Sequence, residues 1–244
     1  MRGHPRPGIG RPAGGATRRP PARPGAVGNA TGGGLRSWLA DARRLDLAVY
    51  AAVAATPTPT MDEGLRRLSG AADRSKLWVG CSALLAAIGG PRGRRAAENG
   101  LASIALTSAV VNLGLKPLGN RRRPDRVTAE VPLTRQVTMP RSTSWPSGHS
   151  ASAFAFATGA GAAWPAAGIP LSALASLVAY SRVHTGVHYP SDTIAGTVAG
   201  VALAPVAVAA VARRRRRSSR STSCGDPRLR GRDGGPRRTR RRRA

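Results

Sequence analysis

The run from Thr193 to Ala212, TIAGTVAGVALAPVAVAAVA, is the longest uninterrupted apolar segment of the chain. It reaches the roughly 20 residues that an α-helix needs to cross a bilayer. Four shorter apolar segments precede it: Leu77 to Gly90, Leu101 to Leu115, Ala151 to Ala167 and Ile169 to Tyr180. By length alone, each of these fits either a membrane helix or a buried helix of a soluble bundle.

The composition of these segments favours the membrane. They carry no charge, and they are rich in Gly, Ala, Ser and Thr, which let helices approach closely in lipid. Helices of a soluble bundle would show polar stripes at helical spacing, and these segments show none. We therefore predict an all-α fold, a membrane-embedded bundle of five to six helices. The stretch from Leu45 to Ala55 is short and carries Asp46, so it is either a first membrane helix or an interfacial one.

Both ends of the chain are basic and lack apolar periodicity. The 244 residues include 39 Lys and Arg against 11 Asp and Glu, which gives a net charge of +28. Such ends cannot bury enough apolar surface to offset chain entropy. We expect disordered arms at residues 1–34 and 213–244, around a helical domain at residues 35–212. Anionic lipid headgroups suit these arms. Nucleic acid is not an expected partner, because no aromatic-rich recognition module accompanies the arginines.

The sequence offers little for metals or disulfides. Its two cysteines, Cys81 and Cys224, have neither disulfide nor metal-ligand spacing. From residue 100 to 212 the only acids are Asp125, Glu130 and Asp192. Metal-dependent phosphatases need clustered acidic and histidine ligands. We therefore expect no metal and no other cofactor.

Three short stretches at the edges of the apolar segments carry reactive groups, and two of them supply fixed cations. Residues 116–124 read KPLGNRRRP, and the third stretch begins with Ser181-Arg182. Cleavage of a phosphate ester needs the charge on the equatorial oxygens to be held, and guanidinium is a permanently charged, planar fork of donors. The candidates are Lys116, Arg123 and Arg182. We expect Arg121 and Arg122 to face lipid headgroups instead.

The second stretch, Pro146-Ser147-Gly148-His149, opens a helix after a polar loop. Proline suits the entry to a helix, glycine permits a close approach of the backbone to a ligand, and free backbone donors at a helix start favour an anion. Taken alone, His149 fits a capping or interfacial histidine equally well.

The third stretch, Ser181 to Asp192, contains two of the four histidines, His184 and His188. An imidazole can accept a phosphoryl group covalently when a carboxylate fixes its tautomer and supports the cation that develops. Asp192 lies four residues beyond His188 and can fill that role. It can also cap the helix that follows.

The alternation of segments predicts that the three stretches meet at one face of the membrane. The basic connector with Arg92, Arg94 and Arg95 lies on the side of the C-terminal arginine run if four helices follow it. The positive-inside rule then predicts a multi-pass protein of the cell membrane, with an extracytoplasmic active site and a cytoplasmic C-terminal tail.

The pattern Lys-(six residues)-Arg-Pro, Pro-Ser-Gly-His and Ser-Arg-(five residues)-His-(three residues)-Asp resembles the three motifs of the type 2 phosphatidic acid phosphatase (PAP2) family, whose superfamily includes vanadium haloperoxidases. The resemblance covers about Asp62 to Ala212. It implies metal-independent hydrolysis of lipid phosphates or diphosphates, with phosphatidate-like or polyprenyl phosphates as substrates.

His188 resembles the nucleophile, Asp192 its orienting partner and His149 the general acid. Lys116, Arg123 and Arg182 resemble the phosphate clamp, to which Ser147 and Gly148 add hydrogen bonds. His184 matches no required position.

Two other functions fit parts of the sequence. A vanadate-dependent haloperoxidase would use the same pocket, although that activity suits a soluble protein better. A non-catalytic basic protein would bind nucleic acid or anionic membrane through the arms alone.

Overall fold

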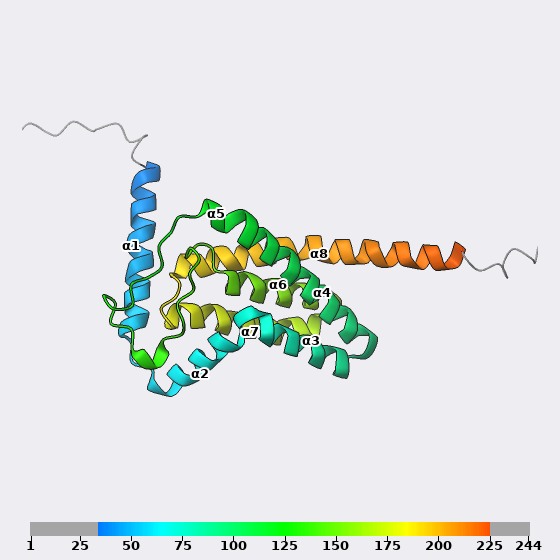
Figure 1. Cartoon of the computed structure of the whole chain (residues 1–244), viewed down its shortest axis with the longest axis horizontal. Helices are drawn as coiled ribbons and strands as arrows, with labels where there is room; N and C mark the ends of the chain where they lie inside the picture. Colours follow the sequence, from blue (N-terminus) through cyan, green and yellow to red (C-terminus); the bar gives the residue numbers. More distant parts are fainter. Residues whose placement is uncertain (1–33, 225–244) are drawn as a thin grey trace, which may run out of the picture. The chain divides into compact units, whose positions relative to one another are not determined.

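A computed structural model describes residues 34–224 of the chain, and these residues form helices and no strand (Figure 1). The α-helices are α1 (Gly34–Ala55), α2 (Pro59–Ala71), α3 (Lys76–Ile88), α4 (Gly90–Ala109), α5 (Lys116–Leu118), α6 (Gly148–Ala163), α7 (Pro165–His184) and α8 (Pro190–Cys224). Short helical turns are η1 (Asp73–Ser75), η2 (Val110–Leu115) and η3 (Leu133–Arg135). The predicted all-α fold is confirmed. The chain divides after Ala40 into two compact units, and the three motif stretches belong to the second.

Helix α6 lies at the centre of the bundle, against α4, α7 and α8 (Figure 1). Its side chains Ala153, Phe156 and Ala160 are fully buried, and Phe156 packs on Trp78 of α3 with ring centroids 5.2 Å apart. Helix α8 comes close to α6 at Gly200, where an added Cβ atom would lie 2.3 Å from the carbonyl oxygen of Ala151. Small residues at such crossings let two backbones approach closely.

Three helical segments are long and apolar enough to cross a membrane: Gly90–Leu118, Pro165–His184 and Pro190–Ser219. The apolar segments predicted from Leu77 and from Ala151 form α3 and α6, which have 13 and 16 residues and so fall short of a full span. The membrane character of the chain is thus confirmed. The structure offers three candidate spans within residues 34–224, where five to six membrane helices were predicted.

Two helices extend beyond the predicted apolar segments, and both extensions are rich in arginine. Helix α4 begins at Gly90 instead of Leu101, with Pro91 at its start, so the basic connector with Arg92 is helical. Helix α8 continues past Ala212 through the arginine run to Cys224, so the chain does not leave the helix at the predicted boundary. Arginine is a good helix former, which explains both differences. The remaining parts of the two predicted arms, residues 1–33 and 225–244, lie outside the described residues.

The stretch predicted from Leu45 to Ala55 belongs to the longer helix α1, which is not among the candidate spans. Only Asp46, Tyr50 and Ala54 are buried along α1, at a spacing of one helical turn. An ionised carboxylate such as that of Asp46 is buried only where it is paired. Its partners belong to the site described below.

A buried polar network holds the connection between α5 and α6 against the ends of α1, α2 and α7. Arg135, 1% exposed, donates to Asp62 Oδ1 at 2.9 Å and to the carbonyl of Thr56 at 2.7 Å. His184 lies 3.2 Å from the same carboxylate oxygen and 3.0 Å from Thr58 Oγ1. His184 is therefore part of the scaffold behind the three motifs.

Candidate active site

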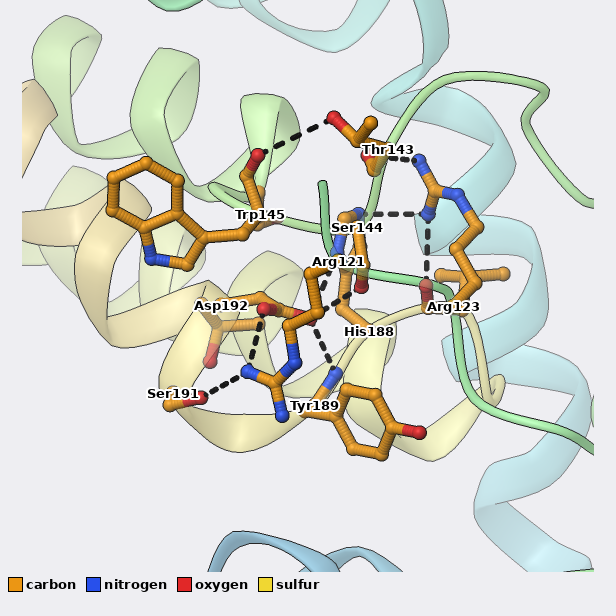
Figure 2. A network of polar contacts seen from close by, with 12 residues as sticks. Arg121, Arg123, Thr143, Ser144, Trp145, His188, Tyr189, Ser191 and Asp192 are labelled. Carbon is orange, nitrogen blue, oxygen red and sulfur yellow. Dashed lines mark hydrogen bonds and ion pairs between the residues drawn. The ribbon is translucent and has the colours of Figure 1, made fainter. Parts of the chain in front are cut away.

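The three motif stretches meet in space, and Figure 2 shows Arg123 of the first stretch beside His188 of the third. Lys116 and Arg182 lie at the ends of their candidate spans, and Asp192 lies in the first turn of the third. Arg123 Nη1 is 3.2 Å from His188 Nε2, which joins the first stretch to the third. The backbone N–H of Ser147 donates to the carbonyl of Asp192 at 2.9 Å, which joins the second stretch to the third.

His188 follows a tight turn between α7 and α8. Gly186 adopts a left-handed conformation there, with φ of +71°. The backbone N–H of His188 donates a hydrogen bond to the carbonyl oxygen of Arg182 at 3.2 Å. The His188 side chain is 2% exposed. Burial lowers the pKa of His188 to about 4, and the nearby cations Arg123 and Arg182 lower it too. The imidazole is thus neutral at pH 7, with a lone pair on one ring nitrogen.

Asp192 lies behind His188 and is held by groups other than the imidazole. Its Oδ2 accepts from Ser144 Oγ at 2.5 Å and from the backbone N–H of Tyr189 at 2.9 Å. The Nδ1 atom of His188 lies 3.6 Å from the same oxygen, beyond hydrogen-bond distance. Catalytic hydrogen bonds are often long before substrate binds. The contacts with Ser144 and Tyr189 fix the carboxylate beside the imidazole ring.

Arg121 is part of the site, and the sequence-based prediction that it faces lipid headgroups is wrong. Its guanidinium donates to Asp192 Oδ1 at 3.0 Å (Figure 2). It also donates to Asp46 Oδ2 at 2.5 Å. It also lies 4.2 Å over the Tyr189 ring. The physical reason is that two buried carboxylates need a shared counter-charge. Arg122 is exposed, as predicted.

The guanidinium of Arg123 is fixed beside the nucleophile candidate. It donates to the carbonyl oxygens of Val187 at 2.8 Å, Ser142 at 2.9 Å and Thr143 at 3.3 Å. Backbone carbonyls do not neutralise the charge, so the group keeps a full positive charge next to His188 Nε2. This arrangement suits a phosphate oxygen that arrives with its phosphorus at that nitrogen.

Arg182 and Lys116 complete the set of cations. Arg182 is 1% exposed, and its Nη1 donates to Ser69 Oγ of α2 at 2.5 Å. Its Nε atom is buried without a hydrogen-bond partner among the described residues. A phosphate oxygen would satisfy this donor. Among residues 34–224, Lys116 Nζ donates to Ser142 Oγ at 3.3 Å, near the start of α6.

The start of α6 carries the second motif. Ser147 caps the helix, since its Oγ accepts from the N–H of Ser150 at 3.4 Å and from the Ser150 hydroxyl at 3.0 Å. Its own O–H therefore remains available as a donor. Gly148 is the first residue of the helix and His149 the second. These positions agree with the predicted contacts to phosphate, which remain predictions.

His149 contacts an acid that sequence reasoning missed. Its Nε2 lies 2.7 Å from Oδ1 of Asp73, in η1 between α2 and α3. Burial lowers the pKa of His149, whereas the contact with Asp73 acts in the opposite direction. Nothing in the sequence signals this pair, because the two residues are 76 positions apart and Asp73 belongs to none of the three motifs.

Within residues 34–224, no cluster of three or more His, Cys, Asp or Glu side chains could hold a metal ion. The acids at the site are instead engaged with arginines, hydroxyls and imidazoles. The site is thus a set of fixed cations around two histidines, each with its own carboxylate.

Comparison with known proteins agrees with this geometry. The model of the PAP2 superfamily matches residues 99–216. Decaprenylphosphoryl-5-phosphoribose phosphatase of Mycobacterium tuberculosis, from strains CDC 1551 and H37Rv, is 35% identical over 168 residues, which cover 68% of this chain and 90% of the relative. The chain belongs to the PAP2 superfamily. The sequence-based predictions of this family and of a phosphatase that acts on lipid phosphates are confirmed.

Two solved structures have a similar fold. LpxE of Aquifex aeolicus superposes with a TM-score of 0.56 at 24% identity, over 67% of this chain and 94% of that structure. The transmembrane PAP2 type phosphatidylglycerolphosphate phosphatase of Bacillus subtilis gives a TM-score of 0.52 at 24% identity, over 68% and 84%. The segment that matches the superfamily contains all the predicted site residues of this PAP2 phosphatase, whereas Asp46 and Asp73 precede it.

Proposed function

We propose that this PAP2 phosphatase removes a terminal phosphate from a polyprenyl-linked sugar phosphate through a phosphoryl intermediate on His188. The observation that carries the proposal is the contact of Arg123 with His188 Nε2 at 3.2 Å, with Asp192 behind the opposite edge of the ring. The positive charge of Arg123 thus lies beside Nε2 of His188, where it would hold an anionic phosphate group for attack by that nitrogen.

In the first step, the Nε2 lone pair of neutral His188 attacks phosphorus, and the bond from phosphorus to the ester oxygen breaks. The departing oxygen takes its proton from protonated His149, which becomes neutral. Lys116, Arg123 and Arg182 hold the charge of the equatorial oxygens. Asp192 stabilises the cationic ring of His188, whose Nδ1 keeps its hydrogen.

In the second step, water attacks the phosphorus of phosphohistidine. Neutral His149 takes a proton from that water as the bond from phosphorus to Nε2 breaks. Inorganic phosphate leaves, His188 is neutral again, and His149 is again protonated. Every proton has a donor and an acceptor among these residues, so the scheme uses no metal.

The substrate class rests on the mycobacterial relative, whose name places a phosphate on the ribose of a polyprenyl-phosphate-linked sugar. The position of the candidate active site, at the ends of three candidate spans, fits such a substrate, because the prenyl chain stays in the lipid while the sugar phosphate reaches the membrane surface. We extend the proposal to a multi-pass protein of the cell membrane with this end extracytoplasmic, because Arg92 and the arginine run of α8 lie at the opposite ends of their helices.

The proposal is tested with purified protein in detergent and three substrates: a phosphorylated prenyl-phosphate sugar, a polyprenyl diphosphate and phosphatidate. We expect the first to have the highest kcat/KM. Replacement His188→Ala should abolish turnover of all three while the unfolding temperature stays close to that of the wild type. EDTA should leave the wild-type rate unchanged. Wild-type activity in the folded His188→Ala protein would overturn the mechanism, and preference for phosphatidate would overturn the substrate class.

A further inference from the structure

Asp73 lies outside the motifs and outside the segment matched by the superfamily, yet it contacts one of the two histidines of the site. Its Oδ1 is 2.7 Å from His149 Nε2. The exposed fractions of the two side chains are 54% for Asp73 and 22% for His149, so the pair borders the solvent side of the site. This contact gives His149 a carboxylate partner of its own, separate from the Asp192 that serves His188.

The backbone that carries Asp73 is held in an unusual conformation. Arg74 and Ser75, the next two residues, have left-handed φ values of 53° and 60°. Non-glycine residues adopt this conformation at an energetic cost, and they keep it only where the surroundings fix it. One turn earlier, Ser69 binds Arg182 at 2.5 Å. The end of α2 and η1 therefore support two motif side chains from outside the motifs.

We propose that Asp73 is a positioning residue for the general acid: it binds His149 through Nε2 and leaves Nδ1 as the nitrogen that exchanges a proton with the leaving oxygen and with water. The inference rests on the proposed function, since it gives His149 its tautomer in both steps. The Nε2 atom keeps its hydrogen throughout and donates it to Asp73. The Nδ1 atom loses its proton to the leaving oxygen in the first step and regains one from water in the second.

The charges around His149 show what the carboxylate contributes. Asp73 faces the imidazole from η1, Arg182 from α7 and Lys116 from α5. Burial and both cations favour the neutral ring, and Asp73 favours the protonated ring that the first step requires. In return, the hydrogen bond from His149 lowers the pKa of Asp73. Removal of the carboxylate should therefore make His149 lose its proton at a lower pH.

The test compares esters with poor and good leaving groups. A general acid matters for an alkyl phosphate, whose alkoxide needs a proton, and little for an aryl phosphate with a nitrophenolate leaving group. Replacement Asp73→Asn should lower kcat/KM on the alkyl ester by about 10-fold, part of the loss expected for a missing general acid. It should leave kcat/KM on the aryl ester nearly unchanged, because kcat/KM reports the leaving-group step and not the later hydrolysis of phosphohistidine. The alkaline limb of the kcat/KM profile on the alkyl ester should move to lower pH, and Asp73→Glu, which keeps the charge, should move it back.

Two further variants separate the possible outcomes. Glu63→Gln removes an exposed acid of α2 that pairs with Arg66 and Arg67, and it should behave as wild type. His149→Ala should show the same selective loss on the alkyl ester, only larger. An equal loss on both esters in Asp73→Asn, or an unmoved alkaline limb, would overturn the role of Asp73. If His149→Ala also lacked the selective loss, the proposed assignment of His149 as the general acid would be wrong instead.

Discussion

At the scale of single residues, Arg121 connects the carboxylate of Asp192, the proposed partner of His188, to the rest of the protein. It bridges Asp192 to Asp46, and Asp46 also accepts from the backbone N–H of Ser191 at 2.8 Å. Asp46 belongs to α1, so the position of Asp192 depends on a helix that carries no motif. This arrangement explains how Asp192 stays ionised and fixed while it is fully buried.

Replacement Arg121→Ala should therefore affect both stability and catalysis. It leaves two buried carboxylates without their shared cation, and we expect a loss of about 1–3 kcal/mol in the free energy of unfolding, together with a lower kcat. Thermal unfolding and initial rates in detergent measure both effects. The exposed neighbour provides a matched control, because Arg122→Ala should change stability by less than about 0.5 kcal/mol. Equal effects of the two variants would contradict the bridging role.

The pH dependence of catalysis should report the environment of His188. Burial lowers the pKa of His188 to about 4, and only the neutral ring is a nucleophile. Activity should therefore be present above that pKa and disappear as the pH falls through about 4. The measurement is kcat/KM against pH, corrected for titration of the substrate phosphate. Replacement Arg123→Gln removes one of the cations that lower this pKa, so the acid limb should move to higher pH. A wild-type limb near the ordinary histidine value of about 6.5 would contradict the buried nucleophile.

The residues that sequence analysis found and those it missed differ in one physical respect. The motif residues sit within short stretches whose spacing is visible along the chain. Asp46 and Asp73 act across 75 and 76 positions. Their roles depend on where α1 and η1 pack in the fold, and the spacing of residues along the sequence does not indicate that packing. The one usable signal was Asp46 itself, an acid inside an apolar segment, which implies a buried partner.

At the scale of elements, the site depends on how closely α8 approaches α6. An added Cβ atom at Gly196 would lie 2.3 Å from the carbonyl oxygen of Ser147. The backbone link between Ser147 and Asp192 lies at the same crossing. The second and third motifs are thus held together by a glycine contact between two helices.

Replacement Gly196→Ala should push α8 away from the start of α6. We expect a loss of about 1–3 kcal/mol, as for other overpacked sites, and a fall in kcat because Asp192 and His149 move apart. Gly80→Ala in α3 is the control, since no atom lies within 4 Å of its added Cβ. Unfolding temperatures and rates of the two variants decide the point, and a Gly196→Ala protein as stable and active as the control would refute it.

Sequence patterns predicted the helices well where apolar composition decides them, and less well where arginine does. The segments from Leu77, Ala151 and Ile169 became α3, α6 and α7 with small changes at their ends. The predicted start of α4 was too late in the chain and the predicted end of α8 too early, because the prediction took each group of arginines as the boundary of a helix. Arginine ends a membrane span without ending a helix.

At the scale of the whole molecule, the candidate active site and the arginine-rich helix ends lie at opposite ends of the helices. Arg182 and Asp192 lie at the ends of α7 and α8 that meet at the site. Arg92 begins α4, and Arg215 of α8 pairs with Glu98 of α4, which places the arginine-rich ends of these two helices together. This polarity supports an orientation with the arginine-rich end in the cytoplasm.

Cysteine labelling tests that orientation. In a background in which Cys81 and Cys224 are serine, Val127→Cys places a thiol in the exposed connection between α5 and α6, where Val127 is 86% exposed. Arg217→Cys places a thiol near the end of α8. A membrane-impermeant maleimide should label the first variant in intact cells and the second only after permeabilisation. The reverse pattern would contradict the extracytoplasmic site.

The central claim is that phosphorus passes through His188 on its way to water, and the stereochemistry at phosphorus tests it most directly. An alkyl phosphorothioate made chiral at phosphorus with one heavy oxygen isotope is hydrolysed by the wild-type protein in water that carries a second heavy isotope, and the configuration of the released thiophosphate is determined. Two in-line displacements, one by His188 and one by water, predict retention of configuration. Inversion would show a single displacement by water and would contradict the covalent mechanism.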